Sequence, residues 1–537
     1  MLTWQNTGDP CTPETLTFVN HLMPTRIGYT TALGPYAFTS NNTEITVASN
    51  TGYSPRGLSY FDATGAQQFI FTLSNKIFRY PNNADISRAA AYTNGYFSFA
   101  QYRDKIYGVN GADLLQKSTT GAFADVASTP KLTRIAVNGE YMAGINLVAN
   151  YTLASAAVVA ASAYRLMISA VGNPEQFDYS VDTTAFTQDI VNTGGPLTAL
   201  GTLRDMFVVF QKSGVYVVES TGNPADPWVI RLVSDYFGCE WPDSVIEVNN
   251  VLYWISPTRS GEVCAFDGSQ ITVLSQALQS TIIAETYTDA GFTATGPNYL
   301  NGGLTAATNG ETIVWNRVIV TDSTDRLYAN TVRTQQLYLN IPTGRFGYSN
   351  ILPNTSGIFG VFSNAAQNAI LSITATQISN GANKFKAAYL AATTSTASRA
   401  EFYRGGNDFY KLSNLSMRFS EYADVNNGIA EGLGQFSIPS TYVRKSGGQY
   451  SVLQWTSSKV SGEVVDKPES TALTVPTGAL NTTTNEFNLN SASNRSVSAR
   501  TFGFVLYVPP TNSLTGITIN YATAGTAQAK ATAGVWQ

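Results

Sequence analysis

The feature that most constrains the fold is a strand-turn-strand pattern that recurs along the chain. Each copy has a strand, a polar two-residue turn, a strongly apolar strand, a glycine-containing turn and a strand of alternating character. The polar turns are Arg103-Asp104, Arg204-Asp205, Asn249-Asn250 and, in a weaker copy, Asn309-Gly310. A further tight turn, Ser74-Asn75, joins two β-rich runs. Helical periodicity is nearly absent, so we expect an all-β protein.

The repeat favours a β-propeller over other all-β folds. The apolar second strands begin near Ile106, Met206, Val251 and Thr312. This spacing is irregular, but about 45 to 60 residues is the size of a four-stranded blade with its loops. A sandwich has no reason to reuse one signature in the same order. Charged residues are only 13% of the chain, whereas Tyr, Phe and Gly are abundant, which also favours strands and turns. We predict a propeller of four-stranded blades.

The 537 residues are enough for roughly two to four folding units. We expect residues 1–60 to be an N-terminal segment leading into the propeller and residues 61–350 to form its blades. Residues 351–537 are predicted to be a second β-rich region, which either forms a sandwich or completes the propeller. Within it, the polar, Ala-rich stretches 381–406 and 479–500 are expected to be long loops that order against neighbouring subunits. The strand candidates are 448–458, 500–510 and 516–523.

The tripeptide Gly-Asn-Pro occurs twice, fifty residues apart, with an aromatic residue after each copy. The first copy is Gly172, Asn173 and Pro174, followed by Phe177, and the second is Gly222, Asn223 and Pro224, followed by Trp228. The residue before a proline is pushed to extended geometry, so both copies are typical of turns that direct the next aromatic residue into packing. The first copy precedes the strand pair around Met206 and the second follows it, so we interpret the interval as partly coincidental.

Charge and hydropathy restrict the possible partners. The formal net charge is -4 and Lys plus Arg number only 32, so the chain has no surplus of cations for gripping nucleic acid. A weakly acidic wall along which DNA slides remains compatible with this balance. The most apolar run, residues 153–168, is mostly Ala, contains Arg165 and is shorter than the roughly twenty residues of a membrane span. The N-terminus lacks the features of a secretory signal. We expect no membrane span.

Residues suited to catalysis or metal binding are scarce. The single histidine, His21, is the only one available to a catalytic triad, and a structural role is the simpler interpretation. Cys11, Cys239 and Cys264 are widely separated and form no CxxC motif, so we expect buried thiols, although one pair bridged by a disulfide stays open. Gly-Gly pairs do not fall within phosphate-binding motifs. We predict no cofactor and no metal site.

Paired carboxylates are the one catalytic arrangement that the composition permits, because a glycosidase needs only two of them. The candidate pairs are Asp178 with Asp182, and Glu240 with Asp243 beside Trp241. Neighbouring aromatic residues suit stacking on sugars, but carboxylates in turns beside aromatics are common in β proteins. A hydrolase and a sugar-binding surface therefore stay open as alternatives.

Residues 164–270 carry a sequence of elements with a known counterpart. An Asn-Pro-Glu segment with a following aromatic comes first, then an apolar strand pair around Ser213-Gly214, then a strand that ends in Phe266, Asp267 and Gly268. In this order the stretch resembles the β-propeller of short-tailed bacteriophage tail proteins, the nozzle (tail tubular) and tail-hub family. Residues 20–35 also look like the family's Arg-containing, Gly-rich approach to the propeller. The C-terminal third has no such counterpart.

The resemblance implies a structural virion protein of the phage tail. Its members form a ring, expected to be a hexamer, that lies below the portal and adaptor proteins, carries tail fibres or spikes and encloses the channel through which genomic DNA leaves. On this basis we expect a non-enzymatic nozzle protein that is assembled in the host cytoplasm and passes DNA without sequence-specific binding. The alternative is a receptor- or polysaccharide-binding tail protein with carboxylate-based glycosidase activity, which would be expected to form trimers.

Overall fold

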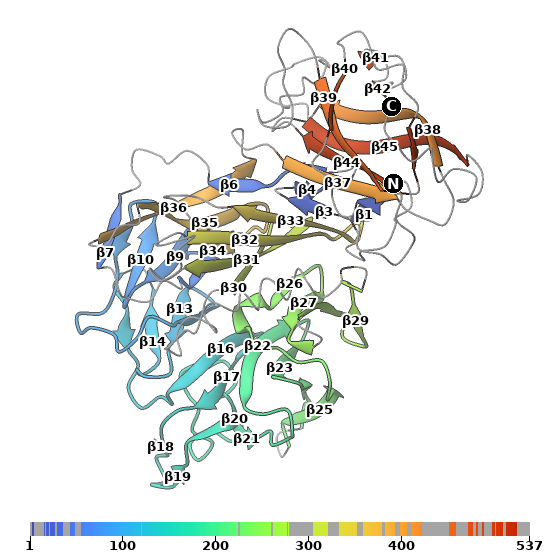
Figure 1. The fold of residues 1–537 in the computed structure, drawn as a ribbon. Coiled ribbons are helices and arrows are strands. Elements are labelled where there is room, and N and C mark those ends of the chain that lie inside the picture. The colour runs from blue at the N-terminus through green and yellow to red at the C-terminus, as the bar shows by residue number, and fades with distance from the viewer. Residues whose placement is uncertain are drawn as a thin grey trace.

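The computed structural model places strands along most of the chain (Figure 1). The structure describes residues 55–119, 121–223, 226–258, 261–276, 304–320, 332–351, 358–377 and 382–392, together with Leu278, shorter stretches between 3 and 48, and strands between 398 and 523. One short 3-10 helix, η1 (Pro242–Ser244), is the helical element among these residues. The predicted all-β class is confirmed.

Five sheets of four antiparallel strands follow one another along the chain, and each is one blade. From the innermost strand outward, blade 1 is β8 (Gly57–Phe61), β9 (Gln67–Leu73), β10 (Lys76–Tyr80) and β11 (Ala84–Asp85), and blade 2 is β12 (Ser98–Tyr102), β13 (Lys105–Val109), β14 (Gln116–Ser118) and β15 (Ala124–Asp125). In the same order, blade 3 is β16 (Leu132–Asn138), β17 (Tyr141–Leu147), β20 (Ser162–Ile168) and β21 (Phe186–Asp189), and blade 4 is β22 (Leu197–Leu203), β23 (Met206–Gln211), β24 (Val215–Ser220) and β25 (Trp228–Ser234). Blade 5 is β26 (Ile246–Val248), β27 (Val251–Ser256), β28 (Glu262–Phe266) and β29 (Ile271–Val273). A small hairpin, β18 (Tyr151–Thr152) and β19 (Val158–Val159), is inserted into blade 3.

Two more blades complete a ring of seven. Blade 6 is β30 (Leu304–Thr308), β31 (Thr312–Val320), β32 (Val332–Asn340) and β33 (Arg345–Ile351). Blade 7 takes β34 (Ile358–Ser363), β35 (Ile370–Gln377) and β36 (Ala382–Ala392) from late in the chain, and its outer strand, β7 (Ile45–Ala48), from the N-terminal segment. The innermost strands contact one another in order, and β34 contacts β8. The predicted propeller of four-stranded blades is therefore confirmed.

The seventh blade falls across the segment boundaries that we drew from the sequence. The range 61–350 covers most of blade 1 and blades 2 to 6, whereas blade 7 is built from residues 358–392 and from β7. Early and late parts of the chain thus pair in one sheet, and this pairing closes the ring because β7 leads directly toward blade 1. Ring closure by strands from both ends of the chain prevents the blades from separating at the first and last repeat.

The expectation that residues 381–406 form a long loop is wrong. They contain β36 and β37 (Ser398–Arg404). β36 lies inside its sheet, with β35 on one side and β7 and β6 (Leu33–Pro35) on the other. Phe385 and Ala387 are fully buried in this strand. Pairing on both edges outweighs the low strand preference of the many alanines, since strand propensity depends strongly on context.

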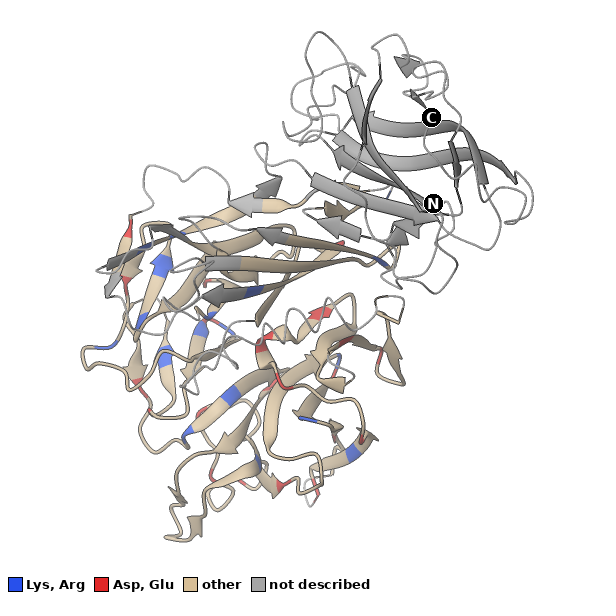
Figure 2. Ribbon diagram, viewed as in Figure 1, with Lys and Arg blue, Asp and Glu red and all other residues tan. Residues whose placement is uncertain are grey.

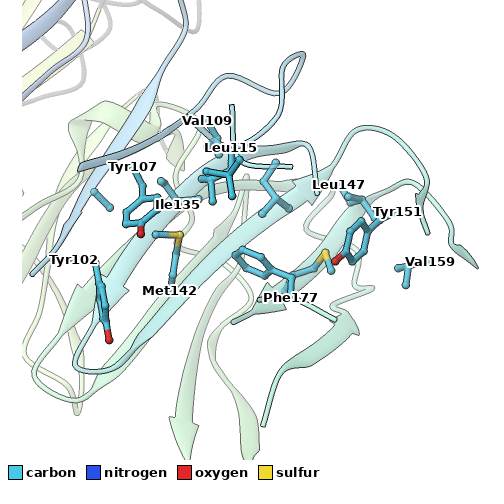
Figure 3. Close-up of a cluster of buried hydrophobic side chains, with 14 of the residues drawn as sticks. Tyr102, Tyr107, Val109, Leu115, Ile135, Met142, Leu147, Tyr151, Val159 and Phe177 are labelled. Carbon is cyan, nitrogen blue, oxygen red and sulfur yellow. The ribbon is translucent and has the colours of Figure 1, made fainter. Parts of the chain in front are cut away.

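Most of the hydrophobic core lies between neighbouring blades. Six clusters of buried side chains occupy the contacts between blades 1 and 2, 2 and 3, 3 and 4, 4 and 5, 6 and 7, and 7 and 1. Figure 3 shows the cluster between blades 2 and 3, where Tyr107 and Val109 face Met142 and Leu147. Between blades 5 and 6, the indole N–H of Trp315 donates to the carbonyl oxygen of Ser244 at 3.0 Å. Each blade is therefore stabilised by its neighbours, as in other repeat folds.

The C-terminal strands form two sheets beyond the ring (Figure 1). One sheet has the order β3 (Phe18–Asn20), β37, β44 (Thr501–Val508), β39 (Tyr450–Ser457) and β40 (Thr471–Val475). The other continues blade 6: β33 is followed by β4 (Leu22–Pro24), β5 (Tyr29–Thr31), β45 (Asn512–Thr523), β38 (Tyr410–Glu421) and β43 (Val497–Ala499). A nine-stranded sheet therefore joins the propeller to the C-terminal region through the N-terminal hairpin β4–β5.

The join between β33 and β4 depends on close packing at Gly347. A Cβ atom added at Gly347 would lie 2.4 Å from the carbonyl oxygen of Leu22 and 2.6 Å from Cδ of Pro24. The hydroxyl of Tyr29, which is fully buried, donates to the carbonyl oxygen of Phe346 at 2.9 Å. Only glycine lets the two backbones approach this closely, so the sequence of β33 is adapted to receive the N-terminal hairpin.

Candidate functional site

The two Gly-Asn-Pro copies lie in corresponding turns of two successive blades, at slightly different distances from the strand ends. The first follows β20 and the second follows β24, which are the third strands of blades 3 and 4. Gly172 and Gly222 have nearly the same positive φ, +70° and +71°. In blade 5, β28 ends at Phe266, and Asp267 and Gly268 (φ +98°) hold the corresponding place after it. The fifty-residue interval thus separates turns that follow the third strands of two successive blades. Pro224 lies outside the described residues.

The aromatic residue after each copy packs between blades. Phe177 is 1% exposed and lies in the cluster between blades 2 and 3 (Figure 3). Trp228 is 4% exposed and its ring meets that of Tyr141 of blade 3 edge-on, with centroids 4.9 Å apart. Each turn therefore delivers a large side chain to an interface between blades, where aromatic pairs add stability beyond their buried area.

Asp267 organises its turn through hydrogen bonds. Its Oδ1 accepts from the N–H of Ser269 at 2.8 Å, the hydroxyl of Ser269 at 2.7 Å and the N–H of Gln270 at 2.9 Å. These bonds, with that from Gln270 the largest contribution, lower the pKa of Asp267 to about 2. Its carboxylate is therefore a turn-forming group of the kind that Asp commonly supplies.

The carboxylates of Asp178 and Asp182 are likewise engaged in local structure. Asp178 accepts the N–H of Ala154 at 2.6 Å and the N–H of Ser180 at 2.8 Å, and Asp182 accepts the hydroxyl of Thr184 at 2.6 Å. Desolvation alone would raise the pKa of Asp178, but its hydrogen bonds outweigh this and hold the pKa below its usual value. The pKa of Asp182 is lowered, mainly by Thr184. A glycosidase acid requires a raised pKa, so the shifts at these two carboxylates run in the opposite direction.

The second candidate pair takes part in ion pairs. Glu240 contacts Nζ of Lys212 at 3.1 Å, and Asp243 contacts two arginines. Trp241 between them is buried, with 8% of its surface exposed, so it offers no open face for stacking on a sugar. Each candidate carboxylate is therefore engaged in a turn or an ion pair.

A cavity of about 390 Å³ lies at the centre of the propeller, lined by residues of the innermost strands. It has room because several of these strands present small residues toward it, namely Ala100, Ala136, Gly201 and Ala306. Phe97 and Phe99 of blade 2 and Val361 and Phe362 of blade 7 add apolar wall. This volume is at the lower end of the range of small-molecule sites.

Three charged side chains cross this cavity from three blades that are not neighbours. Arg56 directly precedes β8 in blade 1, Arg134 lies on β16 in blade 3, and Asp243 lies on η1 before blade 5. The Arg56 Nη2 to Asp243 Oδ2 distance is 2.8 Å, and Arg134 contacts the same carboxylate at 3.3 and 3.5 Å. Desolvation lowers the pKa of Arg56. The negative charge of Asp243 acts in the opposite direction, and the positive charge of Arg134 lowers this pKa further. Sequence reasoning did not anticipate this arrangement.

Metal ligands are scarce in the described part of the chain. Among the residues that the structure describes, no group of three His, Cys, Asp or Glu side chains is placed to hold a metal ion. Cys239 and Cys264 are free, buried thiols in the core between blades 4 and 5, and burial raises the pKa of Cys239 to about 12. His21 and Cys11 lie outside the described residues. No helix within the described ranges is long and apolar enough to cross a membrane.

Exposed apolar side chains are concentrated on blades 3 and 4. Of the eleven large apolar residues that are exposed in the described part of the chain, nine lie between residues 148 and 236. We call these nine the blade 3–4 surface: Val148, Val158, Val171, Tyr179, Val181, Val191, Val229, Leu232 and Tyr236. Blades 3 and 4 lie at the opposite end of the molecule from the C-terminal sheets (Figure 1). Charged residues are sparse over the blades (Figure 2).

No family model matches the chain, and no curated protein matches it. Among solved structures, the computationally designed Ika8 protein is 12% identical, with a TM-score of 0.32, over 67% of this chain and 97% of that one. The structure of U3-55K is 7% identical over 66% of this chain and all of that one, and the RRP9 WD40 repeats are 8% identical over 65% and 100%, both with a TM-score of 0.35. Likeness at this level carries no argument on function. What is established is the class: the chain is a seven-bladed β-propeller protein.

Proposed function

We propose that this chain is a structural subunit of a short bacteriophage tail, in which six copies form a nozzle ring around the DNA-ejection channel below the portal and adaptor. The observation that carries the proposal is the blade 3–4 surface, which we take to be the contact with the next copy in the ring. Exposed apolar side chains on two neighbouring blades are residues that a contact between subunits would bury. A closed ring requires such a contact to be made with a different surface of the neighbouring copy.

The outer strand of blade 4 supports this role for the blade 3–4 surface. β25 has seven residues, whereas the outer strands of blades 1, 2, 3 and 5 have two, two, four and three. Val229 and Leu232 on β25 are each 46% exposed. A long edge strand with exposed apolar residues is a template for contact with another chain. The length of β25 is explained if this edge is covered in an assembly.

The continuous sheet between propeller and C-terminal region suits a part that must transmit force. Its nine strands run from blade 6 through the N-terminal hairpin into the C-terminal strands, and the hairpin is paired at one position on each side, Leu22 with Tyr348 and Tyr29 with Leu514. A flexible linker would leave the two parts free to move relative to each other. A tail nozzle has to hold its shape while DNA passes, and a shared sheet meets that requirement.

DNA would pass through the lumen that the six subunits enclose and not through the centre of a single propeller. The central cavity of about 390 Å³ is crossed by the ion pairs of Arg56, Asp243 and Arg134. The major groove of a DNA duplex is by itself about 12 Å wide, so a duplex cannot enter the central cavity. The lumen of the ring is then the DNA channel, and the net charge of -4 per chain does not favour holding DNA there.

The resemblance to phage tail proteins falls on a well-defined part of the propeller. Residues 164–270 extend from β20 of blade 3 to the turn before β29 of blade 5. They therefore include the three equivalent turns and most of the blade 3–4 surface. The alternative of a glycosidase draws no comparable support, because its four candidate carboxylates are engaged in turns and ion pairs.

The subunit contact can be tested by placing charges on β25. We expect Val229→Asp with Leu232→Asp to reduce the assembly to single folded chains, because a buried unpaired carboxylate is costly at an apolar contact. The matched control is Phe61→Asp, which changes a residue of similar exposure, 44%, on blade 1. Mass measurement and circular dichroism give the readout. An assembly that keeps its mass with both β25 substitutions would remove this surface from the ring contact.

A further inference from the structure

The ion-pair cluster of the central cavity has two positive charges and one negative charge, and Glu247 brings the cavity wall as a whole to two of each. Arg56 and Arg134 share one carboxylate, that of Asp243. The exposed fraction of the side chain is 4% for Arg56, 15% for Arg134 and 21% for Asp243. The one other acidic residue in the cavity wall, Glu247, accepts the N–H of Asn250 at 2.7 Å in the turn after β26. Charges held away from water interact strongly and are normally compensated by a partner.

The two arginines are not equally well paired. Arg56 contacts Asp243 at 2.8 Å, the length of a charge-assisted hydrogen bond, whereas both Arg134 contacts are longer, 3.3 and 3.5 Å. A guanidinium carries five N–H donors in a planar fork that matches the oxygens of carboxylates and phosphates. Arg134 therefore presents donors to the cavity that Asp243 engages only weakly.

We propose that the propeller cavity is a binding site for a small oxyanion, with Arg134 as its principal ligand-binding residue and Arg56 supplying a second positive charge. The ligand carries a carboxylate or a phosphate group, both of which fit a bidentate guanidinium. The apolar side chains of Phe97 and Phe99 and the small residues Ala136 and Gly201 leave space for its remaining atoms. This site does not depend on the proposed ring, because it lies within one propeller.

Isothermal titration of the full-length protein with inorganic phosphate and with succinate tests the site and separates the two ligand classes. Both titrations are run at constant ionic strength, since exposed charges are screened by salt. Arg134→Gln is expected to weaken binding by about tenfold or more, because it removes a charge-assisted hydrogen-bond donor. Asp243→Asn is expected to strengthen binding, because it removes the carboxylate that competes with the ligand.

The matched control is Arg165→Gln. Arg165 belongs to the same blade, has the same 15% side-chain exposure and pairs with one aspartate, Asp189, but does not line the cavity. It is expected to leave binding unchanged. Arg134→Lys keeps the charge and is expected to retain part of the affinity even where Arg134→Gln does not fold. The absence of binding of both anions to the wild-type protein, or equal losses in Arg134→Gln and Arg165→Gln, would overturn the proposal.

Discussion

Asp243 and Arg56 form an ion pair of 2.8 Å that joins blade 5 to blade 1 across the centre of the propeller. Arg134 adds blade 3 to the same carboxylate. Neighbouring blades are held by apolar clusters, so this ion-pair cluster is a connection of a different kind, made between blades that do not touch each other through their cores. Its members come from three distant parts of the chain, and their meeting depends on the ring being closed.

Removing the central carboxylate should therefore destabilise the propeller. We expect Asp243→Asn to lower the free energy of unfolding by about 3 to 5 kcal/mol, because two largely buried arginines lose their counter-charge. The comparison is Lys76→Gln, which breaks an exposed pair whose side chains are 60% and 40% exposed and should cost about 1 kcal/mol or less. Urea unfolding measures both. Equal losses in the two variants would show that the central cluster has no special weight.

The equivalence of the two Gly-Asn-Pro turns predicts equal responses to the same substitution. Gly172→Ala and Gly222→Ala should each cost about 1 to 2 kcal/mol, because both positions have a left-handed backbone that an L side chain disfavours. Gly172→Asn and Gly222→Asn should recover part of the loss, since Asn adopts this conformation more readily. Thermal unfolding of the four variants checks this. A loss at one turn and none at the other would contradict their equivalence.

The join between propeller and C-terminal region should be sensitive at Gly347. We expect Gly347→Ala to cost about 1 to 3 kcal/mol, because its Cβ would overlap the carbonyl oxygen of Leu22. Hydrogen exchange in residues 22–31 should become faster, as β4 and β5 lose their docking. Gly121→Ala is the control, since nothing lies within 4 Å of a Cβ at that position. Unchanged exchange in 22–31 would show that the hairpin is held mainly by other contacts.

The hairpins of the propeller were predictable because their information is local. The turns at Ser74, Arg103, Arg204 and Asn249 all have positive φ and join the strands that the sequence pattern indicated. Blade 3 does not stand out as a copy in the sequence because the β18–β19 hairpin interrupts it between β17 and β20. Insertions of this kind hide a repeat without changing its packing.

Features that depend on distant parts of the chain were not predictable in the same way. The alanines of β36 give no strand pattern in the sequence, and its neighbours β35 and β7 decide its structure. Asp243 was a candidate for acid catalysis on the strength of its neighbour Trp241, but its partner Arg134 is 109 residues away. The sequence identifies a residue that carries a carboxylate, but the closed ring determines which residue pairs with it.

The mass of the assembled wild-type particle, determined together with end-on images, is the most direct test of the proposed nozzle. We predict a closed ring of six chains in which blades 3 and 4 face the neighbouring copy and the open lumen lies between propellers. A stable single chain, or a trimer of the kind expected for a receptor-binding or depolymerising tail protein, would contradict it.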